Sequence, residues 1–303
     1  MKDLHPRIPL SRLCGLFDKS RQAFYQRQQV IYAQAMEEEF VLSEVKKIRH
    51  RQPRLGGRKL LVKLEESGIQ IGRDALFALL GQNGLLVRRR RNATRTTNSH
   101  HWLRKYPNLI RHFEPMRPNQ LWVCDITYLE TTEGYLYLFL ITDACSHKII
   151  GWALADNLES DNAVKALQMA FKTMKTNCFG LIHHSDRGVQ YCSDKYVKLL
   201  NQYSIQISMT ENGDPLENAI AERVNGILKN EWLYDIGRID MANMHKIIPQ
   251  IIHIYNHERP HLSLDMLTPN VAHQMTEQLK KRWKNYYKPD STRNVHEASS
   301  CTN

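Results

Sequence analysis

The sequence contains no long apolar run and no paired cysteines. No stretch approaches the ~18 consecutive apolar residues that a membrane-spanning helix requires, and residues 1–6 lack the apolar core of a signal peptide. The 6 cysteines are scattered, and none forms a C-x-x-C pair. These absences argue against a membrane protein, a disulfide-stapled fold and a cysteine-based zinc site, and they favour a cytoplasmic protein with reduced thiols.

Charge is distributed unevenly along the chain, whose net charge is +11. Residues 1–120 contain 24 Lys and Arg against 10 Asp and Glu (+14), whereas residues 121–303 contain 18 against 21 (−3). A basic front part is typical of polyanion binding, and an acidic rear part is compatible with metal binding. The change of charge coincides with a change in the predicted secondary structure.

The basic part reads as short helices joined by turns. A first helix-turn-helix outline covers residues 1–35, where Ser20 can cap the second helix, and another covers residues 36–87. In the second outline the helix that begins near Arg73 is the expected recognition helix, so Arg73 is a candidate DNA contact. An ordinary helical packing domain is the alternative. The expected helices cover residues 9–17, 20–25, 36–48, 58–64 and 73–80.

Residues 88–117 form a basic linker in this interpretation. Residues 88–101 contain no acid and no apolar periodicity, so we expect them to be extended or disordered until they bind a polyanion. A solvated linker without DNA contacts is the alternative. The expected contacts to the phosphate backbone are Arg88, Arg89, Arg90 and Arg91.

From residue 118 the pattern changes to strands and helices. Three strands separated by turns are followed by helices that alternate with two more strands, an order that resembles the RNase H-like mixed α/β sheet. This predicted core covers residues 118–275, and a basic, frayed tail covers residues 276–303. The expected strands cover residues 121–129, 135–142, 149–154, 180–184 and 205–209. The expected helices cover residues 160–175, 194–202, 216–229 and 242–254.

Three acids occupy informative positions in this core. Asp125 lies in the first strand, Asp186 ends the fourth, and Glu222 lies in a helix, with 35 residues between the last two. Gathered carboxylates repel one another and resist burial, whereas Mg²⁺ prefers such hard oxygen ligands. Two ions roughly 3.5–4 Å apart stabilise both oxygens of an in-line phosphoryl displacement. On spacing alone, three unrelated acids are the simpler interpretation.

The residues around these acids match known motifs. His184–Tyr191 reads H-S-D-x-G-x-Q-Y, Glu217–Arg223 reads acid-N-A-x-x-E, and Tyr255–His261 reads Y-N-x-x-R-x-H. With these motifs the sequence resembles the DDE transposases of insertion-sequence family three (OrfB type), which have a retroviral-integrase-like core. The resemblance covers nearly the whole chain. Many relatives have Asp where Glu217 stands, a departure that keeps an acid at this position.

The resemblance implies that Asp125, Asp186 and Glu222 are the catalytic acids and the ligands of two Mg²⁺ ions, with Mn²⁺ as a substitute. It also implies that the first and fourth strands are neighbours, which would place Asp125 beside Asp186. The implied partners are double-stranded DNA (terminal inverted repeats and target), further copies of the chain in a homo-oligomer, and the product of an upstream reading frame, in a bacterial, nucleoid-associated setting. The implied DNA contacts in the core are Lys229, Asn218 and Arg259.

The implied activity is that of a DNA transposase, which hydrolyses phosphodiesters at insertion-sequence ends and then carries out strand transfer. Two alternatives stay open: an RNase H-fold nuclease without strand transfer, and a catalytically silent DNA-binding regulator. Glu217 or Glu231 could replace Glu222 as the third carboxylate. For His183 and His184, packing is expected rather than metal ligation.

Overall fold

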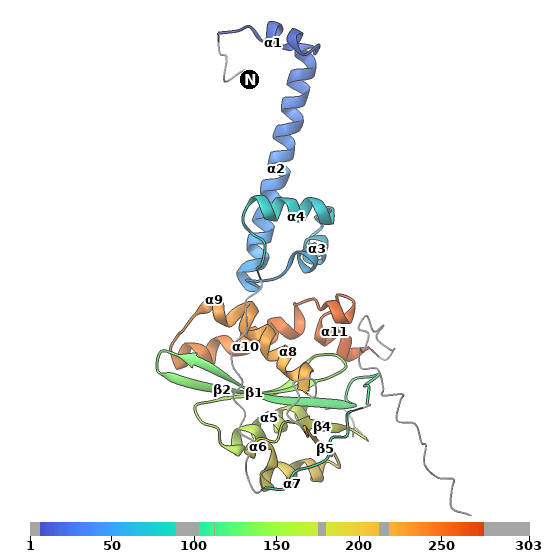
Figure 1. Cartoon of the computed structure of the whole chain (residues 1–303), viewed down its shortest axis with the longest axis vertical. Coiled ribbons are helices and arrows are strands. Elements are labelled where there is room, and N and C mark those ends of the chain that lie inside the picture. Colours follow the sequence, from blue (N-terminus) through green and yellow to red (C-terminus); the bar gives the residue numbers. More distant parts are fainter. Residues whose placement is uncertain (1–6, 89–102, 112, 175–179, 212–217, 276–303) are drawn as a thin grey trace, which may run out of the picture.

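The computed structural model describes residues 7–88, 103–111, 113–174, 180–211 and 218–275. It consists of a helical front part and an α/β core that contains the sheet (Figure 1). The long helix of the front part points away from the core.

The front part contains four helices: α1 (Leu10–Leu16), α2 (Arg21–Arg51), α3 (Gly57–Glu66) and α4 (Arg73–Gln82). Ser20 caps α2 as predicted, since its Oγ accepts from Ala23 N at 3.0 Å. The prediction of two separate helices at 20–25 and 36–48 is wrong, because α2 is continuous and the expected boundary at residue 35 falls inside it. The physical reason is that residues 21–51 contain neither Gly nor Pro, so nothing ends the helix.

A small apolar cluster joins α3 and α4 to the C-terminal half of α2. Helix α4 begins at Arg73, as the second helix-turn-helix outline predicts. Its role in reading DNA stays a prediction. The fully buried members of the cluster are Val45, Leu55, Leu60, Leu64, Leu76 and Leu80.

The core contains a five-stranded mixed sheet in the order β3-β2-β1-β4-β5. Strands β1, β2 and β3 pair antiparallel, whereas β1, β4 and β5 pair parallel. This is the predicted RNase H-like order, and it makes the first and fourth strands neighbours. The strands are β1 (Leu121–Thr131), β2 (Gly134–Asp143), β3 (Ile149–Ala155), β4 (Ile182–Ser185) and β5 (Gln206–Met209).

Helices cover both faces of the sheet (Figure 1). One face packs against α5 (Ser160–Thr173), α6 (Val189–Cys192) and α7 (Asp194–Gln202). The other packs against α8 (Ala219–Leu228), the π-helix η2 (Lys229–Leu233) and α10 (Met241–His257). The remaining short helices are α9 (Tyr234–Ile236), η3 (Leu262–Leu264) and α11 (Pro269–Gln274). None of the described helices is long and apolar enough to cross a membrane.

The described end of the predicted linker belongs to the core. Met209 N donates to Pro107 O at 3.3 Å, and Leu109 N donates to Ser208 Oγ at 2.9 Å, so this segment runs along the open edge of β5. Leu103 packs against the core as well. The predicted linker therefore ends near residue 103 rather than 117, and its residues 89–102 lie outside the described ones.

The front part contacts the core through ion pairs that all have the same orientation. In each pair the cation comes from the front part and the acid from the core. Trp232 of η2 adds a hydrogen bond, since its Nε1 donates to Arg51 O at 2.8 Å. The pairs are Arg51–Glu258, Arg54–Asp235 and Lys59–Glu231.

Candidate active site

Strand pairing brings Asp125 and Asp186 together. Leu121 of β1 faces Ile182 of β4, an offset of 61 residues, and the same offset separates Asp125 from Asp186. Because the strands are parallel neighbours, both carboxylates lie at the same level of the sheet, just beyond the end of β4. Both side chains are partly exposed.

Two asparagines of the α8 segment attach this helix to β1 beside Asp125. Asn225 Nδ2 donates to Asp125 Oδ2 at 2.7 Å, and Asn218 Nδ2 donates to Cys124 O at 2.9 Å. Both asparagines are buried. They therefore fix the position of the Asp125 carboxylate and the distance between α8 and the strand.

The turn after β4 holds Asp186. Its Oδ1 accepts from Gly188 N at 3.0 Å. A Cβ at residue 188 would lie only 3.0 Å from the same Oδ1. A side chain at residue 188 would therefore press against the Asp186 carboxylate, which would have to move by a few tenths of an ångström.

The electrostatics of the site oppose the ionised form of Asp125. Burial raises the pKa of Asp125 to about 7, and the charge of Asp186 adds to this rise. Hydrogen bonds from Asn225 and from Ile126 N lower the pKa again, and Glu222 raises it by the smallest of these effects. Burial lowers the pKa of Lys229, but attraction to Asp125 opposes that change, so the lysine lies within electrostatic reach of Asp125.

Glu222 is exposed on α8, and it acts on Asp125 from the facing helix. In the described part of the chain, no three His, Cys, Asp or Glu side chains lie close enough to form a ready metal site. The structure therefore brings Asp125 and Asp186 together on neighbouring strands. It places Glu222, the third predicted acid, on α8, which packs against β1.

Asn225 is a site residue that the sequence-based prediction missed. The positions 218, 222, 225 and 229 are separated by four, three and four residues, so they follow one face of a helix. Asn225 lies three residues after Glu222 on that face, and this spacing was the signal for it. Asn218 was predicted as a DNA contact, but its side chain is buried against Cys124 O, which suits a structural attachment instead.

Comparisons with known proteins cover this whole region. Residues 115–215 match one integrase core domain model, and residues 203–269 match a second. The chain is 36% identical over 263 residues to the insertion element IS600 uncharacterized 31 kDa protein of Shigella sonnei, covering 85% of this chain and 96% of that protein. It is 33% identical over 218 residues to the transposase InsF for insertion sequence IS3A of Escherichia coli K12, covering 71% and 75%.

This chain belongs to the insertion-sequence transposases with an integrase core. Of its predicted acids, Asp125 and Asp186 fall within the first matched domain model and Glu222 within the second. Among solved structures, the HTLV-2 integrase catalytic core domain in complex with magnesium aligns with a TM-score of 0.42 at 19% identity, covering 53% of this chain and 99% of that one.

The two histidines before Asp186 pack within the core of the transposase, as predicted. His183 Nε2 lies 2.8 Å from both Tyr196 Oη and Cys124 Sγ. Burial lowers the pKa of His183 to about 3, so the ring is neutral. His184 Nδ1 is hydrogen-bonded to Ser208 Oγ at 2.8 Å. Both rings, which belong to β4, are therefore engaged with buried residues of neighbouring elements.

One predicted DNA contact of the transposase is wrong. Arg259 is only 3% exposed, and its Nε donates to Glu231 Oε2 at 2.7 Å, so its guanidinium is enclosed. Glu231 is equally engaged: burial alone would raise its pKa, but Arg259 and Lys59 lower it overall. A partly buried acid that is bound to two cations is not available as the third catalytic carboxylate, and Glu217 lies outside the described residues.

The remaining predicted DNA contacts differ in exposure. Arg73 is exposed at the start of α4 and pairs with Asp74 at 2.8 Å. Arg88 is exposed, whereas Lys229 is half-buried near Asp125. The other three arginines of the run, Arg89, Arg90 and Arg91, lie outside the described residues.

Proposed function

We propose that this transposase cuts and joins DNA by metal-dependent phosphodiester chemistry at Asp125, Asp186 and Glu222. The observation that carries the proposal is the shared offset of 61 residues, which brings two acids to the same level of the neighbouring strands β1 and β4. The integrase core match supports the same assignment.

The residues present fit Mg²⁺ by their chemistry. Asp125 and Asp186 provide the two carboxylates that Mg²⁺ typically takes from a protein, with phosphate oxygens and water completing its shell. Burial and then the charge of Asp186 raise the pKa of Asp125, and a divalent cation would relieve both by compensating the ionised carboxylate. Asp125 and Asp186 would hold the metal, and Glu222 would join them once DNA is bound.

When bound, two Mg²⁺ or Mn²⁺ ions would activate the attacking oxygen and stabilise the leaving oxygen of an in-line displacement. Asn225 holds the Asp125 carboxylate in place, and Asn218 attaches the start of α8 to β1, so that Glu222 on this helix acts on Asp125. Lys229 lies seven residues after Glu222 on the same helical face, so it is suited to bind a DNA phosphate next to the acids.

Two reactions follow from this arrangement. In the first, water attacks a phosphodiester at the element end, and the bond to the 3′ oxygen breaks to release a 3′-hydroxyl. In the second, that hydroxyl attacks a phosphodiester of the target and displaces its 3′ oxygen. Neither reaction requires a covalent protein intermediate.

The front part would select the DNA. Helix α4 with Arg73, together with the basic run Arg88–Arg91, would bind the terminal inverted repeats, while the core acts on the ends and on the target. Cutting two ends in a coordinated way requires at least a dimer on DNA, and the product of an upstream reading frame is a further candidate partner. Such an assembly would act at the bacterial nucleoid.

Substitution of the acids tests the proposal. Asp125→Asn, Asp186→Asn and Glu222→Gln should each abolish nicking and strand transfer, because each removes a ligand charge, while gel-shift binding to the repeats survives. Glu130→Gln is the matched control, since Glu130 is an exposed acid at the far end of β1 that pairs with Arg238. Near-normal nicking by one of the three variants would remove that residue from the site.

The same assay separates the two alternatives. A nuclease without strand transfer would nick the repeat ends but fail to join pre-cleaved ends to a target duplex. A silent regulator would bind the repeats and show no metal-dependent nicking at all.

A further inference from the structure

Arg223 directly follows Glu222, the third acid of the proposed active site, in α8. Successive residues of an α-helix are turned by about 100° around its axis, so the exposed Arg223 side chain lies on a different face from Glu222. Arg223, Ile227 and Glu231 are spaced by four residues and follow one side of α8 and η2. This side of the helix leads to the front part, because Glu231 pairs with Lys59 of α3.

Side chains from three other segments gather near this side of α8. They come from α3, from the turn between β2 and β3, and from the loop after α10. Glu231 binds the two cations among them, since Lys59 Nζ lies 3.3 Å from its Oε1 and Arg259 Nε donates to its Oε2 at 2.7 Å. We call the whole group, with Arg223, the junction cluster. Its members are Lys59, His147, Arg223, Glu231, Arg259 and His261.

The charge of Arg223 acts on both rings and on the lysine of the junction cluster. Burial is the largest cause of the lowered pKa of Lys59, about 8, and of His147, about 4, and the charge of Arg223 contributes to both. The pKa of His261 is lowered by burial first, and Arg223 again adds to this change. Arg223 therefore lies close to these three groups. Both histidines are neutral near pH 7, and their ring centroids lie 6.0 Å apart.

The junction cluster holds more positive than negative charge. Its three cations face a single carboxylate, Glu231, which already binds Lys59 and Arg259. Arg223 therefore has no acid of its own within the cluster, and its charge and that of Lys59 repel each other. An anion beside Arg223 would offset this repulsion. A planar guanidinium is well suited to a phosphate, which it binds through two parallel hydrogen bonds.

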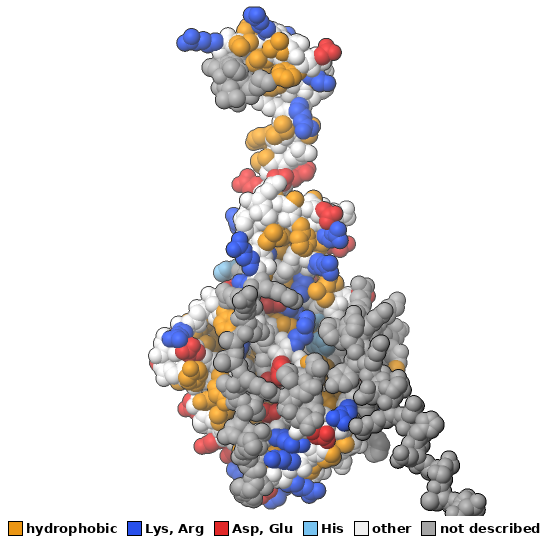
Figure 2. Space-filling model, in the orientation of Figure 1, with side chains coloured by type: hydrophobic (Ala, Val, Ile, Leu, Met, Phe, Trp, Pro, Cys, Tyr) orange, Lys and Arg blue, Asp and Glu red, His pale blue; other side chains and the backbone are white. Residues whose placement is uncertain are grey.

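The junction cluster lies between the part that is expected to select DNA and the part that is expected to cut it. It connects α3 with α8, and the front part lies on the α8 and α10 side of the sheet (Figure 1). Figure 2 shows Lys and Arg side chains next to histidine where the two parts meet. A duplex that is held by the front part and cut at Asp125 and Asp186 would cross this place, so the matching anion is a phosphate of its backbone.

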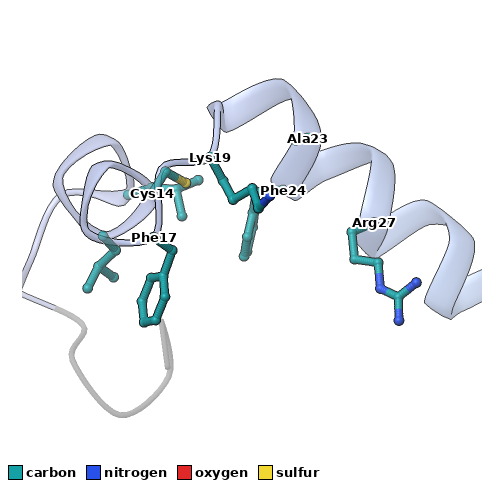
Figure 3. A pocket seen from close by; sticks show the side chains of 8 residues that line it. Cys14, Phe17, Lys19, Ala23, Phe24 and Arg27 are labelled. Atoms are coloured by element: carbon teal, nitrogen blue, oxygen red, sulfur yellow. The ribbon is translucent and has the colours of Figure 1, made fainter.

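Two other exposed arginines are placed differently. Arg27 lies on α2 beside an apolar pocket that α1 forms with the start of this helix, at the end far from the core (Figure 3). Arg238 forms an ion pair with Glu130 at the far end of β1. Arg223 differs from both, because it adjoins a proposed acid and lies where the front part contacts the core.

We propose that Arg223 binds a backbone phosphate of the element end, on the path of the DNA from the front part to the acids. This inference rests on the proposed function, and it gives to Arg223 the DNA contact that the resemblance implied for Arg259. Glu231 holds Lys59 and Arg259 in place, and their charge strengthens the attraction without contact to the DNA. The contact carries no sequence preference, because every nucleotide presents the same phosphate.

The salt dependence of binding tests the proposal on the full chain in EDTA, where no cleavage occurs. Fluorescence anisotropy with a repeat-end duplex over a NaCl series gives the slope of log K against log salt. Arg223→Gln should make this slope shallower by about 0.9, the value for one phosphate, and weaken binding to repeat and scrambled duplexes alike, by about tenfold at low salt. Arg223→Lys should keep the slope, because it keeps the charge. Arg238→Gln is the matched control and should change neither value.

Uncharged phosphates locate the contact. In a set of duplexes, one phosphate at a time is replaced by a methylphosphonate. At one position, between the bases that the front part binds and the cleaved bond, Arg223→Gln should cause no further loss of affinity, because the charge that it removes has already lost its partner. At the other positions the losses from the two changes should add.

An unchanged slope in Arg223→Gln, losses that add at every phosphate, or no binding of the full chain to either duplex would overturn the proposal. Urea unfolding should give the same midpoint for Arg223→Gln as for the wild type, since this side chain is exposed. A lower midpoint would assign Arg223 to the structure instead. The same loss should appear in an Asp125→Asn background, so a failure of the catalytic assignment, which nicking reveals, is seen separately from a failure of this one.

Discussion

At the residue scale, Asp125 is the acid of the site whose pKa its surroundings raise, to about 7. Burial and the charge of Asp186 favour its protonated form, whereas Asn225 and Ile126 N donate to its ionised form. The protein thus holds the carboxylate in a fixed position while leaving much of its charge uncompensated. This combination prepares the side chain for a cation and makes the metal-free protein sensitive to pH.

We expect the metal-free transposase to lose stability as the pH rises from about 4 to about 7. In this window the unfolded state releases the Asp125 proton while the folded state, with its raised pKa, keeps it, so stability falls until the folded pKa is passed. Asp125→Asn removes this ionisation and should gain about 2 kcal/mol over the wild type near pH 8, after allowance for partial exposure, and nothing near pH 4. Urea unfolding in EDTA measures both values.

A second variant locates the cause of this loss. Asn225→Ala deletes a hydrogen bond that lowers the pKa of Asp125, so the loss of stability should continue to higher pH than in the wild type. Glu130→Gln should follow the wild-type curve. If Asp125→Asn and the wild type kept a constant difference across the whole range, the titrating group would be another residue.

At the element scale, the strands and the order of the core are predictable from sequence. Apolar runs bounded by turn residues predict all five strands, and the structure places each within a few residues of its expected position. The DDE-type motifs identify the two aspartates, and the pairing of β1 with β4 brings them together.

Other elements depend on information that local sequence does not carry. Helix α8 passes into the π-helix η2 at Lys229, and an extra residue in one helical turn has no residue signature. The segment after Leu103 reads as a linker because its partner, the open edge of β5, exists only after the sheet has formed. Arg259 reads as a DNA contact because the acid that pairs with it, Glu231, comes from a different element.

Glu231 is expected to hold the front part, η2 and the end of α10 together. Lys59 Nζ lies 3.3 Å from its Oε1, and burial, aided by Arg259, lowers the pKa of Lys59 to about 8. Glu231→Ala would leave the buried Arg259 and the partly buried Lys59 without their acid, at a cost of about 3–5 kcal/mol in the free energy of unfolding. Glu258→Ala breaks the more exposed pair with Arg51 and should cost about 0–1 kcal/mol.

Urea unfolding of the two variants compares the pairs directly. Adding Lys59→Met to Glu231→Ala should recover part of the loss, because it removes one of the two unpaired cations. Equal costs for Glu231→Ala and Glu258→Ala would show that the buried pair carries no special weight at this junction.

At the scale of the whole molecule, the front part and the core each have their own apolar clusters, and they meet through charged pairs. Choosing a DNA end depends on contacts to base edges, whereas cutting depends on the acids. The front part and the core each have the means to fold separately, so the assignment of the two tasks to them can be tested on fragments.

A division of the chain before Leu103 should separate the two tasks. The fragment 103–303 keeps the sheet with its β5 edge segment, so it should nick DNA weakly in Mg²⁺ or Mn²⁺ without preference for the inverted repeats. The fragment 1–102 keeps both helix-turn-helix outlines and the basic run, so it should prefer the repeats without cutting. Competition binding with repeat and scrambled duplexes, together with a nicking assay, measures both halves.

A third fragment, 118–303, tests whether the edge segment belongs to the core. It lacks the contacts that Pro107 and Leu109 make with β5, so it should unfold at lower urea than fragment 103–303. Equal stability would return these residues to the linker. If fragment 103–303 instead kept its preference for the repeats, sequence recognition would have to lie on the core itself, where the half-buried Lys229 lies within electrostatic reach of Asp125.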